Sequence, residues 1–518
     1  MNSLVPLFVI VPLGCAFVIT ILGRLINGIC KFITPIFLAY LVYLSLFFIF
    51  RVPETSVYKV GGFEAVNGIP VAIYLVVDGL TKLILLIIST IGFFSILYST
   101  SYTKQYTAER KFYVLFSLMI AGMNGVVLSG DIFNIFVFLE IAAISSYALV
   151  AFGLEKQQLE ASFKYQILGG IASLVILLTI GMLYWNTGTL NIADISGQIV
   201  KACGNSARNT VFLRFVSVLM IAGFGLKAAI FPFHTWLPDA HSSAPSPISA
   251  MLSGVLIKAV GIYVIIRLFF NMFPLNYDVA VTITILGTIS MIVGVLLAIG
   301  QWDMKRLLAY HSISQMGYVI IGVGIGLIIL TKNGDKTLAS LSIMGGLFHL
   351  MNHSIFKSLL FLNAGSVEYR TGTRNLKKLG GLSRAMPITS GTTFVASMSI
   401  SGIPPFNGFF SKMIIIIASV SAGYYWIGFF AVAVSIVTTG SFLKIMKYAF
   451  GNTEMSERLV HKKIKEVPFT MSLSMIMLSI LCLLSALIVI PYFRNIFLKP
   501  AVDVLINSAV YAKTVLGA

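Results

Sequence analysis

Apolar residues along this chain come in long runs that are separated by short polar segments. A helix needs about 20 mostly apolar residues to cross the hydrocarbon core of a bilayer, and about fourteen runs predict such a helix. They lie near residues 4–22, 32–50, 76–98, 112–129, 132–153, 166–185, 211–233, 248–270, 279–299, 307–330, 339–363, 386–419, 425–449 and 469–491. No polar segment is long enough for a soluble domain, so we expect a single membrane domain over residues 1–518.

Composition agrees with this pattern. The chain is 58% hydrophobic and only 10% charged, with a mean hydropathy of +0.95, whereas ordinary soluble domains carry about 25% charged residues. Too few charges remain to cover a water-exposed surface, which excludes a soluble enzyme and a disordered chain. The expected fold class is an all-α polytopic membrane protein, because helices satisfy their own backbone hydrogen bonds in lipid.

Lys and Arg number 36 against 18 Asp and Glu, but they form no basic domain, and we expect no nucleic acid as a partner. Instead they favour the loops after odd-numbered spans, which the positive-inside rule assigns to the cytoplasm. We therefore expect a multi-pass protein of the cell membrane with both termini outside. The basic residues of these loops include Lys104, Arg110, Lys111, Arg370, Arg374, Lys377, Lys378, Lys462, Lys463 and Lys465.

Two spans contain prolines that predict broken helices. The seventh reads GFGLKAAIFPFHTWLP over residues 223–238, and the twelfth reads SGIPPFNGFFSK over residues 401–412. Proline removes a backbone donor and clashes with the preceding turn. Breaks five spans apart suggest two inverted five-helix repeats, a common transporter plan, over about residues 110–271 and 279–450. A second sequence feature agrees with such a repeat: Glu140 precedes Tyr147 by seven residues, and His311 precedes Tyr318 by seven residues.

Ionisable residues inside apolar spans are the candidate functional groups. An ionised side chain at the bilayer centre costs about 2.5–3.5 kcal/mol, so the set must face a hydrated interior or one another. Glu140 is the only carboxylate at comparable depth, so structural pairing would leave most of the lysines unmatched. Desolvation favours the neutral form of a lysine, and a group that is neutral part of the time can pass protons. The candidates are Glu140, Lys227, Lys258, His311, His349, His353, Lys357 and Lys412.

His349, His353 and Lys357 recur every four residues, which places them on one helix face over about 12 Å. Two histidines at this spacing can also bind zinc, but no nearby Glu or Cys completes a site. We expect a titratable relay toward Lys412 and no metal. A polar face with satisfied hydrogen bonds is the alternative.

Other signals predict structural roles. The cysteines form no CxxC pair, the glycines of residues 322–326 follow no strand, and no Walker motif or catalytic carboxylate pair occurs. We therefore expect no cofactor and no redox or hydrolytic site. Asp78 and Lys82 are one turn apart and predict an intrahelical ion pair. Asp239 and His241 are expected to close the end of the broken seventh span, and residues 497–518 to form an amphipathic tail at the membrane interface.

The segment from Lys227 to Ser253, KAAIFPFHTWLPDAHSSAPSPISAMLS, resembles the signature of the proton-translocating antiporter-like subunits. That family includes the D subunit of Mrp-type Na+/H+ antiporters and related subunits of complex I and membrane-bound hydrogenases. The surroundings of Glu140, the helix of His349 and the sequence ending at Lys412 resemble it too. The resemblance extends over about residues 75–490 and is strongest to the Mrp D subunit and its hydrogenase counterpart.

This resemblance implies fourteen helices around a polar axis at mid-membrane. Glu140 and Lys227 would form a coupled pair, and Lys258 would continue toward the centre. His311, His349, His353 and Lys357 would relay protons to Lys412, the terminal group. Other membrane subunits of an antiporter or respiratory complex would be partners, with lipid around them. Protons would be the transported ion, with Na+ a further candidate. A static scaffold subunit and a stand-alone secondary transporter remain as alternatives.

Overall fold

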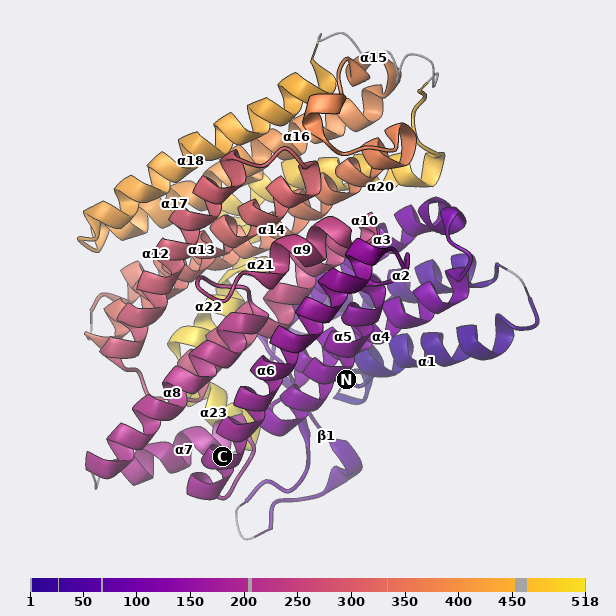
Figure 1. Cartoon of the computed structure of the whole chain (residues 1–518). Helices are drawn as coiled ribbons and strands as arrows, with labels where there is room; N and C mark the ends of the chain where they lie inside the picture. The colour runs from indigo at the N-terminus through magenta and orange to yellow at the C-terminus, as the bar shows by residue number, and fades with distance from the viewer. Residues whose placement is uncertain are drawn as a thin grey trace.

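The computed structural model describes residues 2–26, 28–66, 69–203, 207–332, 334–451 and 464–517, so Lys462 and Lys463 lie outside the described residues. Figure 1 shows a bundle in which the first half of the chain, indigo to magenta, lies beside the orange second half. The first half contains α1 (Leu7–Leu22), α2 (Cys30–Arg51), β1 (Ser56–Lys59), β2 (Tyr74–Val77), α3 (Gly79–Tyr102), α4 (Glu109–Leu128), α5 (Ile132–Val150), α6 (Lys156–Thr187), α7 (Ile192–Cys203), α8 (Ala207–Lys227), α9 (Trp236–Ser243), α10 (Ser246–Met251) and α11 (Tyr263–Asn271). The second half contains α12 (Tyr277–Ile299), α13 (Met304–Thr331), α14 (Lys336–Thr371), α15 (Leu382–Ala385), α16 (Pro387–Ser401), α17 (Asn407–Ser421), α18 (Tyr425–Ile445), α20 (Phe469–Leu484), α21 (Pro491–Phe497), α22 (Lys499–Ile506) and α23 (Ser508–Leu516).

Twelve helices of the described ranges are long and apolar enough to cross a membrane. The two remaining predicted spans are α14 and the α16–α17 pair. α14 has 36 residues but carries His349, His353 and Lys357 in its middle, whereas α16 and α17 have 15 residues each because the span is interrupted. The polytopic helical fold predicted from the apolar runs is therefore confirmed.

Both predicted helix breaks are present. α8 ends at Lys227 and α9 begins at Trp236, and α16 ends at Ser401 before α17 begins at Asn407. Pro238 itself does not interrupt a helix. It lies in the first turn of α9, where a missing N–H removes no intrahelical hydrogen bond.

One local arrangement occurs in both halves of the chain. Asp131 caps α5 and Asp303 caps α13, each by accepting a hydrogen bond from the backbone N–H three residues further on. Asp131 also forms an isolated β-bridge with Asn191, and Asp303 forms the same bridge with Asn375. The start of each helix is thereby tied to the segment that follows the next long helix. This matched geometry is the pattern that a repeat would leave.

Two segments differ from the predicted spans. Residues 76 and 77 were expected in the third span but belong to β2, which pairs antiparallel with β1 from Ser56↔Val77 to Lys59↔Tyr74. The polar segment after α6 contains the amphipathic helix α7.

The C-terminal tail packs on the bundle. α22 contacts α3 and α14, and α23 contacts α7 and α11. The contact with α3 is close, since a Cβ on Gly79 would lie 2.3 Å from the backbone of Pro500. Tyr511 and Val515 of α23 are buried. The apolar side of the predicted amphipathic tail therefore covers protein.

The predicted intrahelical pair of Asp78 and Lys82 is wrong. Asp78 binds Arg267 of α11 through two hydrogen bonds of 2.7 and 2.9 Å, and both side chains are buried. Lys82 instead donates to the carbonyl oxygens of residues 52–54, just after α2. The guanidinium of Arg267 also lies 5.0 Å from the ring centroid of Tyr511, which links the tail to the core.

Candidate functional site

Glu140 and Lys227 lie together at the first helix break. Glu140 is in the middle of α5, and Lys227 is the last residue of α8. Their Oε1 and Nζ atoms are 3.6 Å apart, longer than the usual range of about 2.7–3.2 Å for an N–H···O hydrogen bond. Ser173 of α6 donates a hydrogen bond to the same carboxylate oxygen, whereas the Lys227 ammonium has no hydrogen-bond partner among the described residues. The ion pair is therefore loose.

Glu140 differs from the other candidates in its exposure. Its side chain is 30% exposed, against 5% for Lys227. Phe133, Val137 and Ile144 are exposed on the same helix, and their spacing puts them on the same face as Glu140. A carboxylate inside an apolar outer face is costly if lipid covers it. Covering this face of α5 with lipid alone would therefore be unfavourable.

Lys258 lies where the eighth span changes its helical pitch. Two π-helical turns, η4 (Leu252–Leu256) and η5 (Lys258–Ile262), follow α10. The ammonium donates to the carbonyl oxygens of Ser253 at 2.6 Å and Gly254 at 2.7 Å. π-turns leave such carbonyls displaced from regular helix geometry and are frequent at functional sites. The lysine is 1% exposed, so its charge is satisfied within its own helix.

Two glycines bring this turn against the helices on either side. A Cβ on Gly261 would lie 2.6 Å from the Cβ of Ala228, the residue that follows α8. A Cβ on Gly254 would lie 2.0 Å from Oγ of Ser358 in α14. Any larger residue would therefore separate these segments. The Lys258 turn is packed between the end of α8 and the middle of α14, each of which carries a buried lysine.

The predicted face of α14 is entirely buried. His349 forms hydrogen bonds to Ser411 of α17 at 3.0 Å and to Gln315 of α13 at 3.1 Å. Both of its ring nitrogens are engaged, so neither is free for zinc. His353 and the ammonium of Lys357 have no hydrogen-bond partner in the described part of the chain. The alternative to a relay was a polar helix face whose hydrogen bonds are satisfied. Of the three residues, only His349 fits that description.

Lys412 lies at the second helix break. Its ammonium donates to the carbonyl oxygen of Ile400 at 2.8 Å and to Oγ of Ser435 at 3.2 Å. The carbonyl is free because α16 ends one residue later and leaves its last acceptors unpaired. Gly402 turns the chain there with a φ of 78°. It lies close to Lys412, since a Cβ added to Gly402 would be 3.1 Å from Cδ of the lysine. The Nζ atom also lies 5.0 Å from the ring centroid of Tyr318.

His311 of α13 is buried, and its ring centroid lies 4.9 Å from that of Phe442 in α18. Neither ring nitrogen has a hydrogen-bond partner within the described residues. The neighbouring Ser312 hydrogen-bonds to Ser253 at 2.7 Å, next to the Lys258 turn. Ser312 therefore contacts that turn directly.

The candidate groups form a row across the bundle, from Glu140 through Lys227, Lys258 and the α14 side chains to Lys412. The lysines lie at the end of α8, in a π-turn, in the middle of α14 and next to the end of α16. Several of their buried polar atoms lack a partner in the described residues. Leaving a buried donor unsatisfied costs about 1–3 kcal/mol, and internal water usually removes that cost. We therefore expect ordered water along this row.

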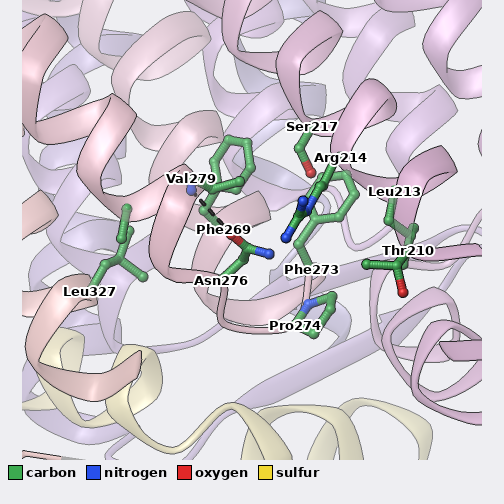
Figure 2. A pocket seen from close by; sticks show the side chains of 11 residues that line it. Thr210, Leu213, Arg214, Ser217, Phe269, Phe273, Pro274, Asn276, Val279 and Leu327 are labelled. Atoms are coloured by element: carbon green, nitrogen blue, oxygen red, sulfur yellow. Dashed lines mark hydrogen bonds between the residues drawn. The ribbon is translucent and has the colours of Figure 1, made fainter. Parts of the chain in front are cut away.

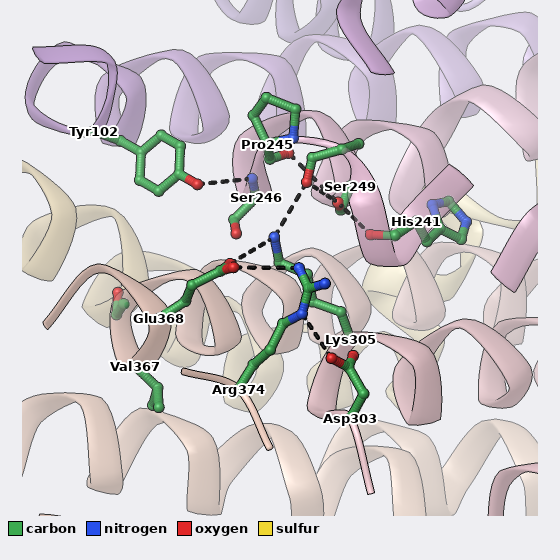
Figure 3. A network of polar contacts seen from close by, with 12 residues as sticks. Tyr102, His241, Pro245, Ser246, Ser249, Asp303, Lys305, Val367, Glu368 and Arg374 are labelled. Atoms are coloured by element: carbon green, nitrogen blue, oxygen red, sulfur yellow. Dashed lines mark hydrogen bonds and ion pairs between the residues drawn. The ribbon is translucent and has the colours of Figure 1, made fainter. Parts of the chain in front are cut away.

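A second cluster of charges was not anticipated (Figure 3). The ammonium of Lys305 lies 2.9 Å from Glu368, and Arg374 lies 3.2 Å from Glu368 and 2.6 Å from Asp303. Lys305 also donates to the carbonyl oxygen of Ala244 between α9 and α10, at 3.1 Å. The cluster joins the start of α13, the end of α14 and the end of the broken seventh span. The sequence signal that could have indicated this cluster was Asp303, at a position suited to cap the start of a helix.

Asp239 and His241 have different surroundings, although both were expected to close the broken span. Asp239 forms surface ion pairs with Arg306 at 2.6 Å and Lys164 at 3.4 Å. His241 is fully buried, with its ring centroid 5.3 Å from that of Phe361. Only Asp239 therefore closes the end, by linking α9 to α6 and α13.

Known proteins match this chain over most of its length. The family described as NADH:quinone oxidoreductase/Mrp antiporter, transmembrane, matches residues 129–438, a range that includes every candidate residue. The D subunit of the Na+/H+ antiporter of Alkalihalophilus pseudofirmus is 34% identical over 477 residues, which cover 90% of this chain and 90% of the relative.

Solved structures share the fold. A chain in the structure of the Mrp complex from Dietzia sp. DQ12-45-1b has a TM-score of 0.87 and 26% identity, covering 100% of this chain and 99% of that chain. A chain of the membrane-bound sulfane sulfur reductase, an archaeal respiratory membrane complex, has a TM-score of 0.84 and 25% identity, covering 99% of both chains. Since the family match spans more than half of the sequence, this multi-pass membrane protein belongs to the transmembrane family of NADH:quinone oxidoreductases and Mrp antiporters.

Proposed function

We propose that this chain is a proton-translocating subunit of a multisubunit membrane complex, of the type of the Mrp antiporter D subunit or its counterpart in membrane-bound hydrogenases. The observation that carries the proposal is the row of buried titratable groups from Glu140 to Lys412. Its lysines lie at the end of α8, in a π-turn, on the α14 face and next to the end of α16. Protons are the transported ion, and Na+ is the candidate for exchange at the level of the complex.

The contacts support the following roles. Glu140 and Lys227 form a loose pair that opens when Lys227 turns away from the carboxylate. Lys258 receives the proton at the centre, and Lys357, His353 and His349 pass it along α14. Lys412 is the terminal group. His311 is buried in α13, and its role is to support transfer between Lys357 and Lys412.

Two matched features support the inverted-repeat plan over about residues 110–271 and 279–450. The helix breaks after α8 and after α16 each lie beside a lysine of the row. The caps of α5 and α13 also form equivalent bridges, from Asp131 to Asn191 and from Asp303 to Asn375. The charge bias of the loops supports placing both termini outside the cytoplasm.

The exposed carboxylate of Glu140 supports a partner in the membrane. On the apolar face of α5, an ionised group covered by lipid costs about 2.5–3.5 kcal/mol. A neighbouring subunit with a polar group at this depth removes that cost. It also gives the complex a route by which a charge change in the partner reaches the Glu140–Lys227 pair.

The test uses Glu140→Gln and Lys227→Ala in the assembled complex. Proton flux or antiport is measured in vesicles with matched protein levels. We expect each variant to abolish translocation and leave assembly largely intact. Glu160→Gln is the control, because Glu160 is an exposed carboxylate of α6 paired with Lys164 four residues away, and it should transport normally.

Near wild-type flux in both variants would refute the coupled pair. Loss of the subunit from the complex in both would favour a static scaffold. Full transport by the purified chain alone, without other subunits, would favour a stand-alone transporter.

A further inference from the structure

A basic pocket at one end of α1, α2 and α4 lies apart from the row of titratable groups. Its volume is about 690 Å³. Lys31, Lys104, Arg110 and Lys111 line it together with a single carboxylate, Glu109. Three positive charges in this pocket are therefore not balanced by a carboxylate of its lining.

The structural contacts use only some of these basic groups. Lys31 forms an ion pair with Glu109 at 2.8 Å, and Arg110 donates to the carbonyl oxygen of Gly23 at 3.2 Å. Lys104 and Lys111 are exposed, and among the described residues no hydrogen bond or ion pair occupies their ammonium groups. Two cations therefore remain available to a ligand, beside a guanidinium that is already positioned.

Exposed apolar ridges run from the pocket along the two helices beside it. Phe17 and Ile21 are exposed on α1, and Phe32 and Ile36 are exposed on α2. Residues four apart share a helix face, so each pair forms a continuous strip. Phe32 is 73% exposed and follows Lys31 directly. Positive charge therefore meets exposed apolar surface at this end of the bundle.

A smaller cavity of about 190 Å³ between α8, α11 and α12 provides a contrast. Figure 2 shows Arg214 beside Phe269, Phe273 and Asn276 in this cavity. Arg214 is paired with Asp278 at 3.2 Å, so its charge is already compensated. The basic pocket differs from this cavity because Lys104 and Lys111 have no ion-pair partner among the described residues.

We propose that the basic pocket binds the phosphate headgroup of an anionic phospholipid, with its acyl chains along the exposed strips of α1 and α2. Basic pockets at the cytoplasmic ends of membrane helices suit such headgroups, and the pocket is on the side that the loop charges assign to the cytoplasm. An acidic soluble segment would use the cations but would leave the apolar strips unexplained. A free phosphate would do the same.

The test compares three forms of the full chain purified in a neutral detergent. They are the wild type, Lys104→Ala with Lys111→Ala, and a control with Lys156→Ala and Lys336→Ala. The control removes two exposed lysines at the starts of α6 and α14 and has the same total charge. Phosphatidylglycerol, phosphatidylcholine and inorganic phosphate are titrated separately, and bound lipid is counted by native mass spectrometry.

We expect the Lys104/Lys111 variant to bind phosphatidylglycerol about 25-fold more weakly, because each lysine near an anionic headgroup contributes a factor of about five. The control should bind like the wild type, and all three forms should bind phosphatidylcholine equally. Equal thermal unfolding in phosphatidylcholine shows that the variant remains folded. A second variant, Phe32→Ala with Ile36→Ala, should also weaken phosphatidylglycerol binding, because it shortens the apolar strip.

Equal phosphatidylglycerol binding by all forms would overturn the proposal. Displacement of phosphatidylglycerol by an equal concentration of inorganic phosphate would show a soluble-anion site and would overturn the lipid assignment. Loss of the bound lipid when the chain joins its complex would mean that another subunit covers the pocket, and this too would overturn it. None of these results depends on the proposed translocation path.

Discussion

Replacing Lys412 with arginine separates a proton carrier from a fixed cation. The ammonium is 2% exposed and donates to the carbonyl oxygen of Ile400 at 2.8 Å and to Ser435 at 3.2 Å. A guanidinium can donate to the same two acceptors and keeps the positive charge. It holds its proton much more tightly than an ammonium group does. The substitution therefore keeps the electrostatic role and removes the acid–base role.

The size of the effect follows from the intrinsic acidity of the two side chains. The pKa of a free arginine exceeds that of a free lysine by about 2–3 units, and each unit corresponds to 1.36 kcal/mol. Reaching the neutral state at this position therefore costs about 3–4 kcal/mol more for arginine. If that state lies on the path, translocation should fall by about 100- to 1000-fold. The larger head group near Gly402 adds an overpacking cost of about 1–3 kcal/mol, which affects stability.

The assay is proton flux per assembled complex in vesicles, with thermal stability measured in parallel. Lys82→Arg is the matched control, because Lys82 is also a buried lysine that donates to backbone carbonyl oxygens, but it lies outside the row. We expect Lys82→Arg to transport normally. Full flux in Lys412→Arg would show that Lys412 is a fixed charge and would refute its assignment as a carrier.

Two further predictions concern α14 and the buried Asp78–Arg267 pair. Replacing His349 and His353 together with alanine should slow translocation several-fold at unchanged assembly, and chelators should have no effect on the wild type. Stoichiometric zinc in the purified protein would contradict this prediction. Asp78→Ala should lower the free energy of unfolding by about 3–5 kcal/mol, because it leaves Arg267 charged and buried. Adding Arg267→Met should restore much of that loss in a thermal unfolding assay, and no recovery would argue against an unpaired charge as the cause.

The features that the sequence predicted well depend on local composition. A membrane span is recognised by its apolar length, and a helix break by its prolines, so the ends of α8 and α16 could be placed near Lys227 and Lys412. The common face of His349, His353 and Lys357 followed from helical spacing alone. None of these inferences required knowledge of a distant contact.

The features that were missed depend on helix ends and distant partners. The eleventh span was expected to end near residue 363, but α14 continues to Thr371, which makes Glu368 a helical residue that can contact Lys305. Asp78 was assigned to Lys82, its neighbour in sequence, whereas its partner Arg267 is 189 residues away. Hydropathy identifies neither the last turns of a helix nor the partner of a buried charge.

The register of the proposed repeat differs by one residue when it is counted from the helix caps and not from the tyrosines. Glu140 lies nine residues after the cap Asp131, and His311 lies eight residues after the cap Asp303. One residue corresponds to about 100° around a helix, so the two side chains point in different directions. Counted from the caps, the counterpart of Glu140 is Ser312, the residue that hydrogen-bonds to Ser253 beside the Lys258 turn.

The buried lysines differ in the acceptors that surround them, and this difference bears on which of them can move a proton. Lys82 donates to three carbonyl oxygens, Lys258 to two, and Lys412 to one carbonyl and one hydroxyl. Lys227 and Lys357 have no hydrogen-bond partner among the described residues. Each hydrogen bond to a charged group contributes about 1.5–3 kcal/mol, so a static scaffold would gain by bonding every lysine. Along the proposed path, Lys227 and Lys357, whose ammonium groups have no hydrogen-bond partner among the described residues, alternate with Lys258 and Lys412, whose ammonium groups have partners. This alternation supports a role as proton carriers, because a proton can leave one lysine as the next one receives it.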